Sequence, residues 1–219
     1  MTPRAYSEGV NRFAVVDVET SGLSLRRDRV LQIGVVIVDG RGSVLERWES
    51  LVRPRRRLLF RVGPTRLHGI RRSALRHAPP LRSVLDELAR RLDGAVFVAH
   101  NAPFDLGFLA KAAAEAGVRL PITATLCTLR LSRELDPDRV LSHRLSAICA
   151  RHGIELVRPH DALADADATA AVLPCLLAAH GFSATEDLAP ARFEHAHFSD
   201  VRFEHARAAN ARVAHAQTA

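Results

Sequence analysis

The stretch FAVVDVETSGL, residues 13–23, starts as an apolar run and then carries two acids, Asp17 and Glu19. The β-branched residues over 13–18 predict a buried strand. Residues i and i+2 of a strand face the same side, so the two carboxylates are expected to point to one spot. Two acids on an apolar strand are costly unless a cation neutralises them. This strand therefore predicts a metal site; a strand end that runs into solvent, where acids cost little, is the alternative.

Three more strands are predicted downstream of this stretch. Residues 30–38, VLQIGVVIV, are almost continuously apolar, which is typical of a central strand covered on both faces. Asp39 and Gly40 predict a hairpin turn into an antiparallel strand over 43–52. The short apolar run AVFVA at 95–99 predicts a fourth strand.

Helices are predicted by apolar periodicity over the ranges 79–92, 103–117, 141–152 and 162–180. Asn101 is the expected cap of the second helix, and Pro174 is expected to kink the last one. A three-stranded meander followed by alternating helices and strands predicts an α/β fold, a mixed sheet with helices on both sides.

Two further acidic clusters lie at predicted helix starts. In HNAPFD, residues 100–105, Asp105 falls in the first turn, where a carboxylate would also favour the helix dipole. In HDALADAD, residues 160–167, the acids Asp165 and Asp167 are two positions apart, and on a helix they point about 200° from each other. Only one of them can face a site. His160 precedes this helix and is free to reach into such a site; a solvent-facing cap histidine is the alternative.

Taken together, the order D-x-E, HNxxFD and H-x4-D resembles the DEDD-type 3′–5′ exonucleases that have a catalytic histidine. The resemblance includes LHGI at 67–70, VFVAHNAPFDLGFL at 96–109, CTLRLSR at 127–133 and LSHRLSAICARHGI at 141–154. It extends over residues 12–180 and is to the epsilon-type proofreading subunits of bacterial replicative polymerases and their stand-alone relatives. It implies a ribonuclease H-like fold, in agreement with the predicted order of strands.

The resemblance also implies roles for residues of the three motifs. Four carboxylates would hold two divalent ions, Mg²⁺ or Mn²⁺, which prefer hard oxygen ligands: Asp17, Glu19, Asp105 and Asp165. His160 would complete this catalytic set as the general base, since an imidazole exchanges protons near neutral pH. Substrate contacts are implied for Val18, Thr20, His100, Asn101 and Phe104, with Thr20 at the terminal nucleotide and Asn101 and Phe104 at its phosphate or sugar.

These roles predict a metal-dependent 3′–5′ exonuclease of the proofreading or repair type. It would act on single-stranded DNA ends and release nucleoside 5′-monophosphates. An exoribonuclease that trims RNA with the same site is the nearest alternative, because the motifs do not fix the sugar. An interaction module, in which the C-terminal tail docks a polymerase subunit or another copy of the chain, is an alternative of a different class.

Basic residues are unevenly distributed along the chain. Of 31 basic residues only Lys111 is a lysine, and residues 53–91 hold 12 arginines against two acids, Asp86 and Glu87. Such a block predicts a polyanion as partner, with the loop arginines 55–57 along the path of an incoming single strand. The alternative is a solvent-exposed helix surface whose cations are arginines because the genome is rich in GC.

Cysteines and apolar runs bear on the compartment. Cys127, Cys149 and Cys175 include no CxxC pair, which predicts reduced thiols rather than a disulfide framework or a zinc site. The polar start lacks the apolar stretch of a signal peptide, and no apolar run reaches the roughly 20 residues of a membrane helix. These features predict a cytoplasmic protein with no membrane partner.

The C-terminal tail has a period of five from residue 186: EDLAP, ARFEH, AHFSD, VRFEH, ARAAN, ARVAH. It resembles the pentapeptide-repeat family, whose members coil as a four-sided β-helix, and a frayed alanine-rich helix is the alternative. Two units are therefore predicted, an exonuclease domain over 1–182 and a short extension over 183–219.

Overall fold

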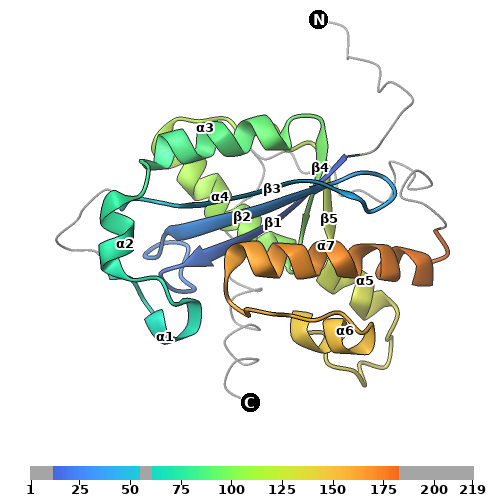
Figure 1. Ribbon diagram of the computed structural model, residues 1–219. Coiled ribbons are helices and arrows are strands. Elements are labelled where there is room, and N and C mark those ends of the chain that lie inside the picture. Colours follow the sequence, from blue (N-terminus) through green and yellow to red (C-terminus); the bar gives the residue numbers. More distant parts are fainter. Residues whose placement is uncertain (1–11, 55–60, 183–219) are drawn as a thin grey trace, which may run out of the picture.

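The structure is a computed structural model that describes residues 12–54 and 61–182. Within these residues five strands form one sheet in the order β3-β2-β1-β4-β5 (Figure 1). β1 pairs antiparallel with β2 and parallel with β4, so the sheet is mixed, as the sequence predicts. The strands are β1 (Arg12–Thr20), β2 (Val30–Val38), β3 (Val44–Leu51), β4 (Ala95–Ala99) and β5 (Thr125–Cys127).

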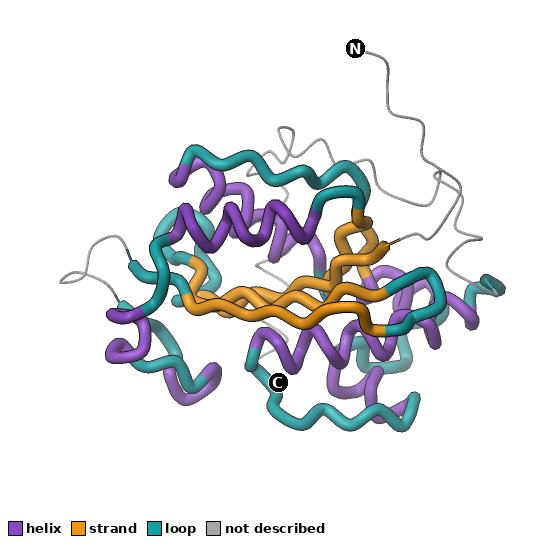
Figure 2. The backbone as a smooth tube through the Cα atoms, turned by 45° about the horizontal axis from the view of Figure 1, so that its top comes forward, coloured by secondary structure: helices purple, strands orange, loops and turns teal. Residues whose placement is uncertain are grey.

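Helices cover both faces of this sheet, which gives the predicted ribonuclease H-like α/β fold. They are α1 (Thr65–His68), α2 (Arg72–His77), α3 (Leu81–Leu92), α4 (Ala102–Ala116), α5 (Thr128–Glu134), α6 (Leu145–Arg151) and α7 (Ala162–Ala179). α3 and α4 lie on one face and α5, α6 and α7 on the other (Figures 1 and 2). α1 and α2 lie at the end of the sheet where β1 finishes (Figure 1).

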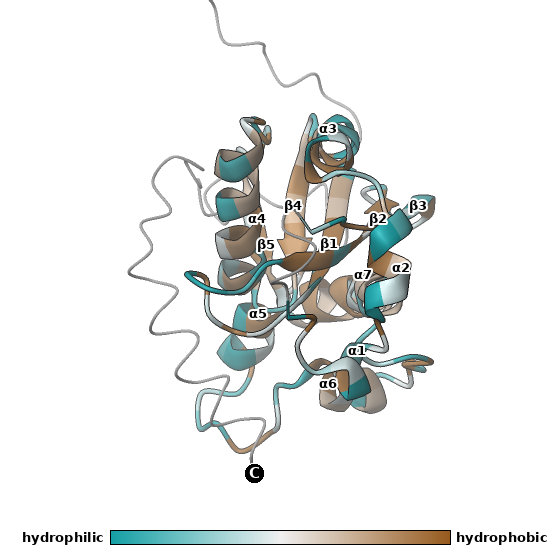
Figure 3. Cartoon of the chain, turned by 90° about the vertical axis from the view of Figure 1, so that its left-hand side faces the viewer, coloured by the Kyte–Doolittle hydropathy of each residue, from teal (hydrophilic) through white to brown (hydrophobic). Residues whose placement is uncertain are grey.

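The alternation of side chains along β1 decides what faces each layer. Ala14 and Val16 pack with α3 and α4, whereas Phe13 and Val15 pack with the helices of the opposite face. By the same alternation the acids that follow on β1 point to the α7 face. β2 is buried along its whole length, as predicted for a central strand, and the apolar strands lie between helices whose hydrophilic sides turn outward (Figure 3).

Of two predictions at helix starts, one is confirmed in position and the other is wrong. Asn101 is the N-cap residue of α4, but its backbone is left-handed (φ 70°) and its side chain makes no capping hydrogen bond. Asn adopts this conformation more readily than most residues, so it also supplies the turn from β4. The predicted helix over 141–152 begins only at Leu145, because Asp136 accepts the backbone N–H of Leu141 at 2.8 Å and holds this segment outside the helix.

α7 is the central helix of its layer. It packs on β1 and β2 and contacts α5 and α6. Within the described residues it is the one helix long and apolar enough to cross a membrane by length and composition, but half of it is buried against the protein, which identifies it as a core helix. It continues through Pro174 to Ala179. The predicted tail over 183–219 and the loop arginines 55–57 lie outside the described residues.

Candidate active site

Four carboxylates from three separate elements meet at the end of β1. Asp17 and Glu19 lie on the α7 side of β1, Asp105 lies in the first turn of α4, and Asp165 lies in the first turn of α7. Burial, followed by repulsion from Asp105, Asp165 and Glu19, holds the pKa of Asp17 well above its ordinary value. This acidic cluster is therefore a set of like charges that the fold forces together.

A glycine in the middle of β2 allows α7 to come this close. Gly34 pairs with Asp17 across the β1–β2 ladder. A Cβ atom at Gly34 would lie 2.3 Å from the backbone carbonyl of Ala162, the first residue of α7. The backbone of α7 thus rests directly on β2, a role that glycine in a strand interior often has. This contact brings the first turn of α7, and with it Asp165, beside the acids of β1.

Asp105 is fixed to β1 by its carboxylate. Its Oδ1 accepts the backbone N–H of Val18 at 3.2 Å, and the residue is only 2% exposed. Burial raises the pKa of Asp105 well above its ordinary value, although the hydrogen bonds that it accepts act in the opposite direction. The carboxylate is thereby held beside β1, next to Asp17.

Glu19, His160 and Asp165 form the tightest group of the site. Their potential ligand atoms all lie within 4.8 Å of one another. Burial and repulsion from Asp165 and Asp105 raise the pKa of Glu19 to about 8. His160 is exposed and left-handed (φ 66°), and its backbone N–H donates to Asp165 Oδ2 at 3.1 Å. This hydrogen bond holds the backbone of His160 next to Asp165 on α7.

The donor set fits a divalent metal ion. Asp165 Oδ1 is buried and has no hydrogen-bond partner among the described residues, although its other oxygen is bonded. A buried, unpartnered carboxylate oxygen is expensive unless a cation takes the place of the missing donor. All four carboxylates offer hard oxygens, the ligands that Mg²⁺ and Mn²⁺ prefer. Divalent ions are in general the cofactors of the family reported below.

Asp165 and Asp167 point in different directions, as their helical spacing predicts. Asp165 faces Glu19 and His160. Asp167 instead accepts Nε of Arg47 on β3 at 2.7 Å, in an ion pair on the surface. The second acid therefore belongs to the packing of α7 against β3.

Three of the residues predicted to contact substrate are engaged within the protein. Val18 is 5% exposed, and its backbone N–H is the donor to Asp105. The Thr20 hydroxyl donates to the carbonyl of Gly22 at 2.8 Å. The His100 Nδ1 lies 3.0 Å from the Thr128 hydroxyl at the start of α5, and burial lowers its pKa to about 4, so the ring is neutral at physiological pH. Their contact with a substrate stays a prediction.

The other two predicted contact residues lie at the start of α4. Asn101 forms the left-handed turn after β4, and Phe104 packs against Phe108 with ring centroids 5.0 Å apart. Both side chains are partly exposed. Their roles in substrate binding stay predictions as well.

Sequence reasoning missed two residues beside the site. Asp161 caps α7 by accepting the N–H of Ala164 at 3.1 Å, and its charge adds to the repulsion on Asp17 and Glu19. An aspartate just before an apolar helix is a capping signal, so it was open to prediction. His68, from the LHGI motif, is buried, and His160 lies close enough to add to the lowering of its pKa by burial. Its position depends on a long-range contact that no local pattern reveals.

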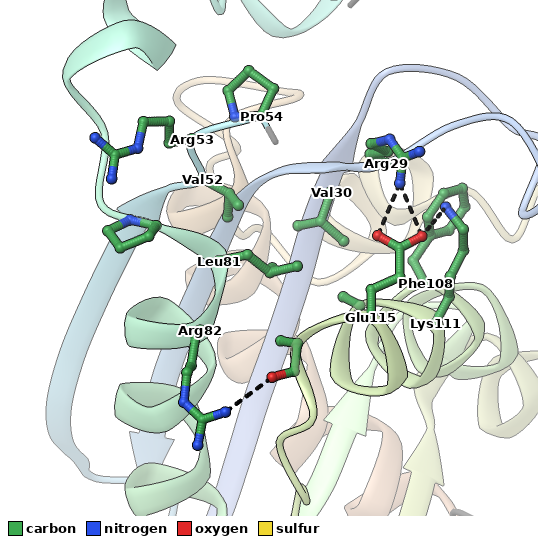
Figure 4. Close-up of a pocket in the computed structure, with 13 residues that line it drawn as sticks. Arg29, Val30, Val52, Arg53, Pro54, Leu81, Arg82, Phe108, Lys111 and Glu115 are labelled. Atoms are coloured by element: carbon green, nitrogen blue, oxygen red, sulfur yellow. Dashed lines mark hydrogen bonds and ion pairs between the residues drawn. The ribbon is translucent and has the colours of Figure 1, made fainter. Parts of the chain in front are cut away.

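A separate pocket of about 350 Å³ opens between α3 and α4 (Figure 4). Val30, Leu81 and Phe108 contribute to its apolar lining, and the Glu115 carboxylate pairs there with Arg29 at 2.8 Å. Val30 and Phe108 belong to the core cluster on the α3–α4 face of the sheet. The pocket therefore lies on the α3–α4 face of the sheet, and none of the four carboxylates of the acidic cluster lines it.

The sequence model of a protein family described as Exonuclease matches residues 14–173, which include the four acids and His160. DNA polymerase III PolC-type of Halalkalibacterium halodurans is 35% identical over 176 residues, and 3′-5′ exonuclease DinG of Bacillus subtilis is 34% identical over 159 residues. The alignments cover 78% and 72% of this chain. The chain spans only 12% and 17% of the length of these two relatives.

The fold has the same kind of relatives. A solved structure of Exonuclease X in complex with 5′ overhanging duplex DNA superposes with a TM-score of 0.61 and 26% sequence identity. The match covers 80% of this chain and 95% of that one. Sequence and fold comparisons thus agree with each other.

Proposed function

The chain belongs to the exonuclease family, and from this premise we propose that it removes nucleotides one at a time from the 3′ end of single-stranded DNA. It would hydrolyse the terminal phosphodiester bond and release a nucleoside 5′-monophosphate. The observation that carries this proposal is the convergence of Asp17, Glu19, Asp105 and Asp165, from three elements, at one point beside His160.

The four carboxylates are proposed to hold two divalent ions, Mg²⁺ or Mn²⁺. When bound, such ions supply Lewis-acid stabilisation of the charge that develops on the phosphate oxygens. The residues of the chain position the reacting groups. Asp105 keeps its place through the N–H of Val18, and Asp165 through the N–H of His160. Both bonds use the backbone, so the acids are held in place before any substrate arrives.

His160 is proposed as the general base. It is exposed, and its ring lies within reach of Glu19 and Asp165, where it can accept a proton from an attacking water. The proton passes from the water oxygen to the imidazole as the oxygen attacks phosphorus and the 3′ oxygen of the preceding nucleotide leaves.

We propose DNA rather than RNA as the substrate because of what the similar proteins are named for or contain. The two curated relatives are named as a DNA polymerase and a 3′-5′ exonuclease, and the Exonuclease X structure contains DNA. The similarity to a DNA polymerase also supports a polymerase as a partner. The three free thiols support a cytoplasmic location: Cys127, Cys149 and Cys175.

The test is a nuclease assay on 5′-labelled DNA and RNA oligonucleotides of one sequence. The full chain is expected to shorten the DNA from its 3′ end with Mg²⁺ and to be inactive with EDTA. Asp165→Asn should abolish hydrolysis, whereas the matched control Asp167→Asn, two positions along the same helix, should retain it. Faster digestion of the RNA would assign the activity to RNA trimming instead, and comparable inactivation by both variants would contradict the assignment of Asp165.

A further inference from the structure

The arginine block over 53–91 divides into two parts in the structure. On α3 the arginines are neutralised: Arg82 pairs with Asp86 at 3.9 Å, and Arg90 pairs with Glu87. Arg91 pairs with Glu46 on β3 at 2.8 Å and also with Glu87. Arg90 and Arg91 occupy the last turn of α3, where the helix dipole favours cations. The α3 arginines are thus explained by the stability of the helix.

The second part is residues 61–77, where the sequence itself supplies no acid. This basic segment contains Arg61, Arg66, Arg71, Arg72 and Arg76, all exposed, and the sequence has no Asp or Glu between residues 50 and 85. Among the described residues, Arg61, Arg66, Arg71 and Arg76 form no ion pair with a carboxylate.

The helix dipole accounts for only part of these charges. Arg66 and Arg76 lie in the last turns of α1 and α2, where the helix dipole favours cations. Arg71 is the N-cap residue of α2, and α2 has no acid in its first turn. A cation at this end of a helix opposes the helix dipole. Helix stability therefore does not explain Arg71, and the basic segment lacks the neutralising acids of α3.

Two contacts place the basic segment at the mouth of the acidic cluster. A Cβ atom at Gly63 would lie 2.1 Å from the carbonyl oxygen of Ser21, so this backbone lies directly against the residue that follows β1. His68 lies close enough to His160 for their charges to interact. Figure 1 shows α1 and α2 at the end of the sheet where β1 finishes and α7 begins. A polynucleotide that leaves the acidic cluster on this side passes over the basic segment.

The basic segment is also held in a defined place. Ile70 and Leu75 pack with Leu31 of β2 in a small core of their own. Leu67, 43% exposed, adds an apolar surface among the cations. On the α5–α6 side of the site, by contrast, Arg130 pairs with Glu134 at 3.5 Å and Arg151 donates to the carbonyl of Ser142 at 2.6 Å. These two arginines of the α5–α6 side are thus engaged within the protein.

We propose that the basic segment binds the phosphates of a single-stranded polynucleotide just upstream of the nucleotide that lies in the acidic cluster. This inference rests on the proposed function and specifies how the substrate is held. A polyanion that approaches four carboxylates is repelled by them, and the arginines at the mouth offset this repulsion. Each phosphate contact releases counterions, so binding should weaken with salt by a slope of about 0.7 per contact.

The test compares two double variants that remove the same charge from neighbouring helices. Arg71→Gln with Arg76→Gln changes the basic segment, and Arg82→Gln with Arg90→Gln is the matched control on α3. Binding of a fluorescent 20-nucleotide poly-dT is measured by anisotropy over a range of salt, with Mg²⁺, in the full chain carrying Asp165→Asn to prevent hydrolysis.

The basic-segment variant is expected to lose about 1.4 from the salt slope and to bind about tenfold more weakly at low salt, whereas the control keeps the starting slope. Arg71→Lys with Arg76→Lys should retain the slope, since it keeps the charge. Equal slopes for both Gln variants, or no binding by the starting protein, would overturn the inference. Hydrolysis of the same DNA by the unmodified chain reports separately on the proposed function.

Discussion

The acidic cluster and the basic segment lie at the same end of the sheet but use charge in opposite ways. In the acidic cluster, packing brings like charges together, and their pKa values rise because the carboxylates are buried and repel one another. In the basic segment, the charges are exposed and remain in water. The charges of the acidic cluster therefore affect the stability of the fold, whereas the interactions of the basic segment depend on the ionic strength of the solution.

The largest expected effect comes from removing one charge of the acidic cluster. Asp17→Asn should abolish hydrolysis and, in EDTA, raise the melting temperature, because one source of like-charge repulsion is gone. Activity assays and thermal melts at pH 8 measure both effects. The basic-segment variant Arg71→Gln with Arg76→Gln should leave the melting temperature where it was. A lower melting temperature for Asp17→Asn would remove the contrast between the two regions.

His160 stands between the two regions, beside Asp165 on one side and His68 on the other. His160→Ala should lower turnover by about 10² to 10⁴-fold, the usual range for loss of a general base. Metal affinity, measured by calorimetry, should change little. The exposed His152 offers a matched control, His152→Ala, with full activity expected. If His160→Ala loses metal as completely as Asp165→Asn does, His160 is a ligand instead.

The next effect tests whether close packing creates the acidic cluster. Gly34→Ala places a methyl group against the first turn of α7 and should destabilise the protein by about 1–3 kcal/mol, the usual cost of overpacking. It should also lower activity, because Asp165 moves away from Glu19. Chemical denaturation and kcat measure the two consequences. Gly69→Ala is an instructive comparison in the basic segment: it has open space but a left-handed φ of 68°, so it should lower stability without a comparable loss of kcat.

The smallest effect is a pH dependence of stability above neutral pH that comes from the acidic cluster. Glu19 has a folded pKa of about 8 against an ordinary value of 4.5, so the folded state holds its proton more tightly. Its contribution to stability is full below about pH 4.5 and is lost as the pH rises through about 8. The melting temperature in EDTA should therefore fall from pH 7 to pH 9, above the range in which His100, with a pKa of about 4, acts in the opposite direction, and Mg²⁺ should flatten the curve. Glu19→Gln should have the flatter curve without Mg²⁺, and a melting temperature that rises with pH would contradict the sign.

The sequence predicts long, periodic elements well and short ones poorly. The bounds of β2 are predicted to the residue, and β1 and β4 follow from their apolar runs. α1, α2, α5 and β5 were not predicted, because three to seven residues are too few for a period to show. The start of α6 depends on Asp136, which lies outside the helix, so no pattern within the helix marks it.

The candidate site follows the same division. Its acids lie in local motifs at strand and helix ends, where the type of residue and the spacing already indicate chemistry. His68 and the close approach at Gly34 depend on contacts between distant parts of the chain, which the sequence does not display. The domain boundary at residue 182 and the substrate contacts of Thr20, Asn101 and Phe104 stay predictions.

The contact between Gly34 and the start of α7 has a consequence for the time at which activity arises during synthesis. The acids on β1 leave the ribosome early, but Asp165 belongs to the last helix that the structure describes. Domains begin to fold from the N-terminus while translation continues, and the contact at Gly34 joins segments far apart in the chain. A growing or prematurely terminated chain therefore carries three of its four acids without the fourth. With Asp165 in its proposed role, unfinished copies of this protein lack a residue that hydrolysis requires.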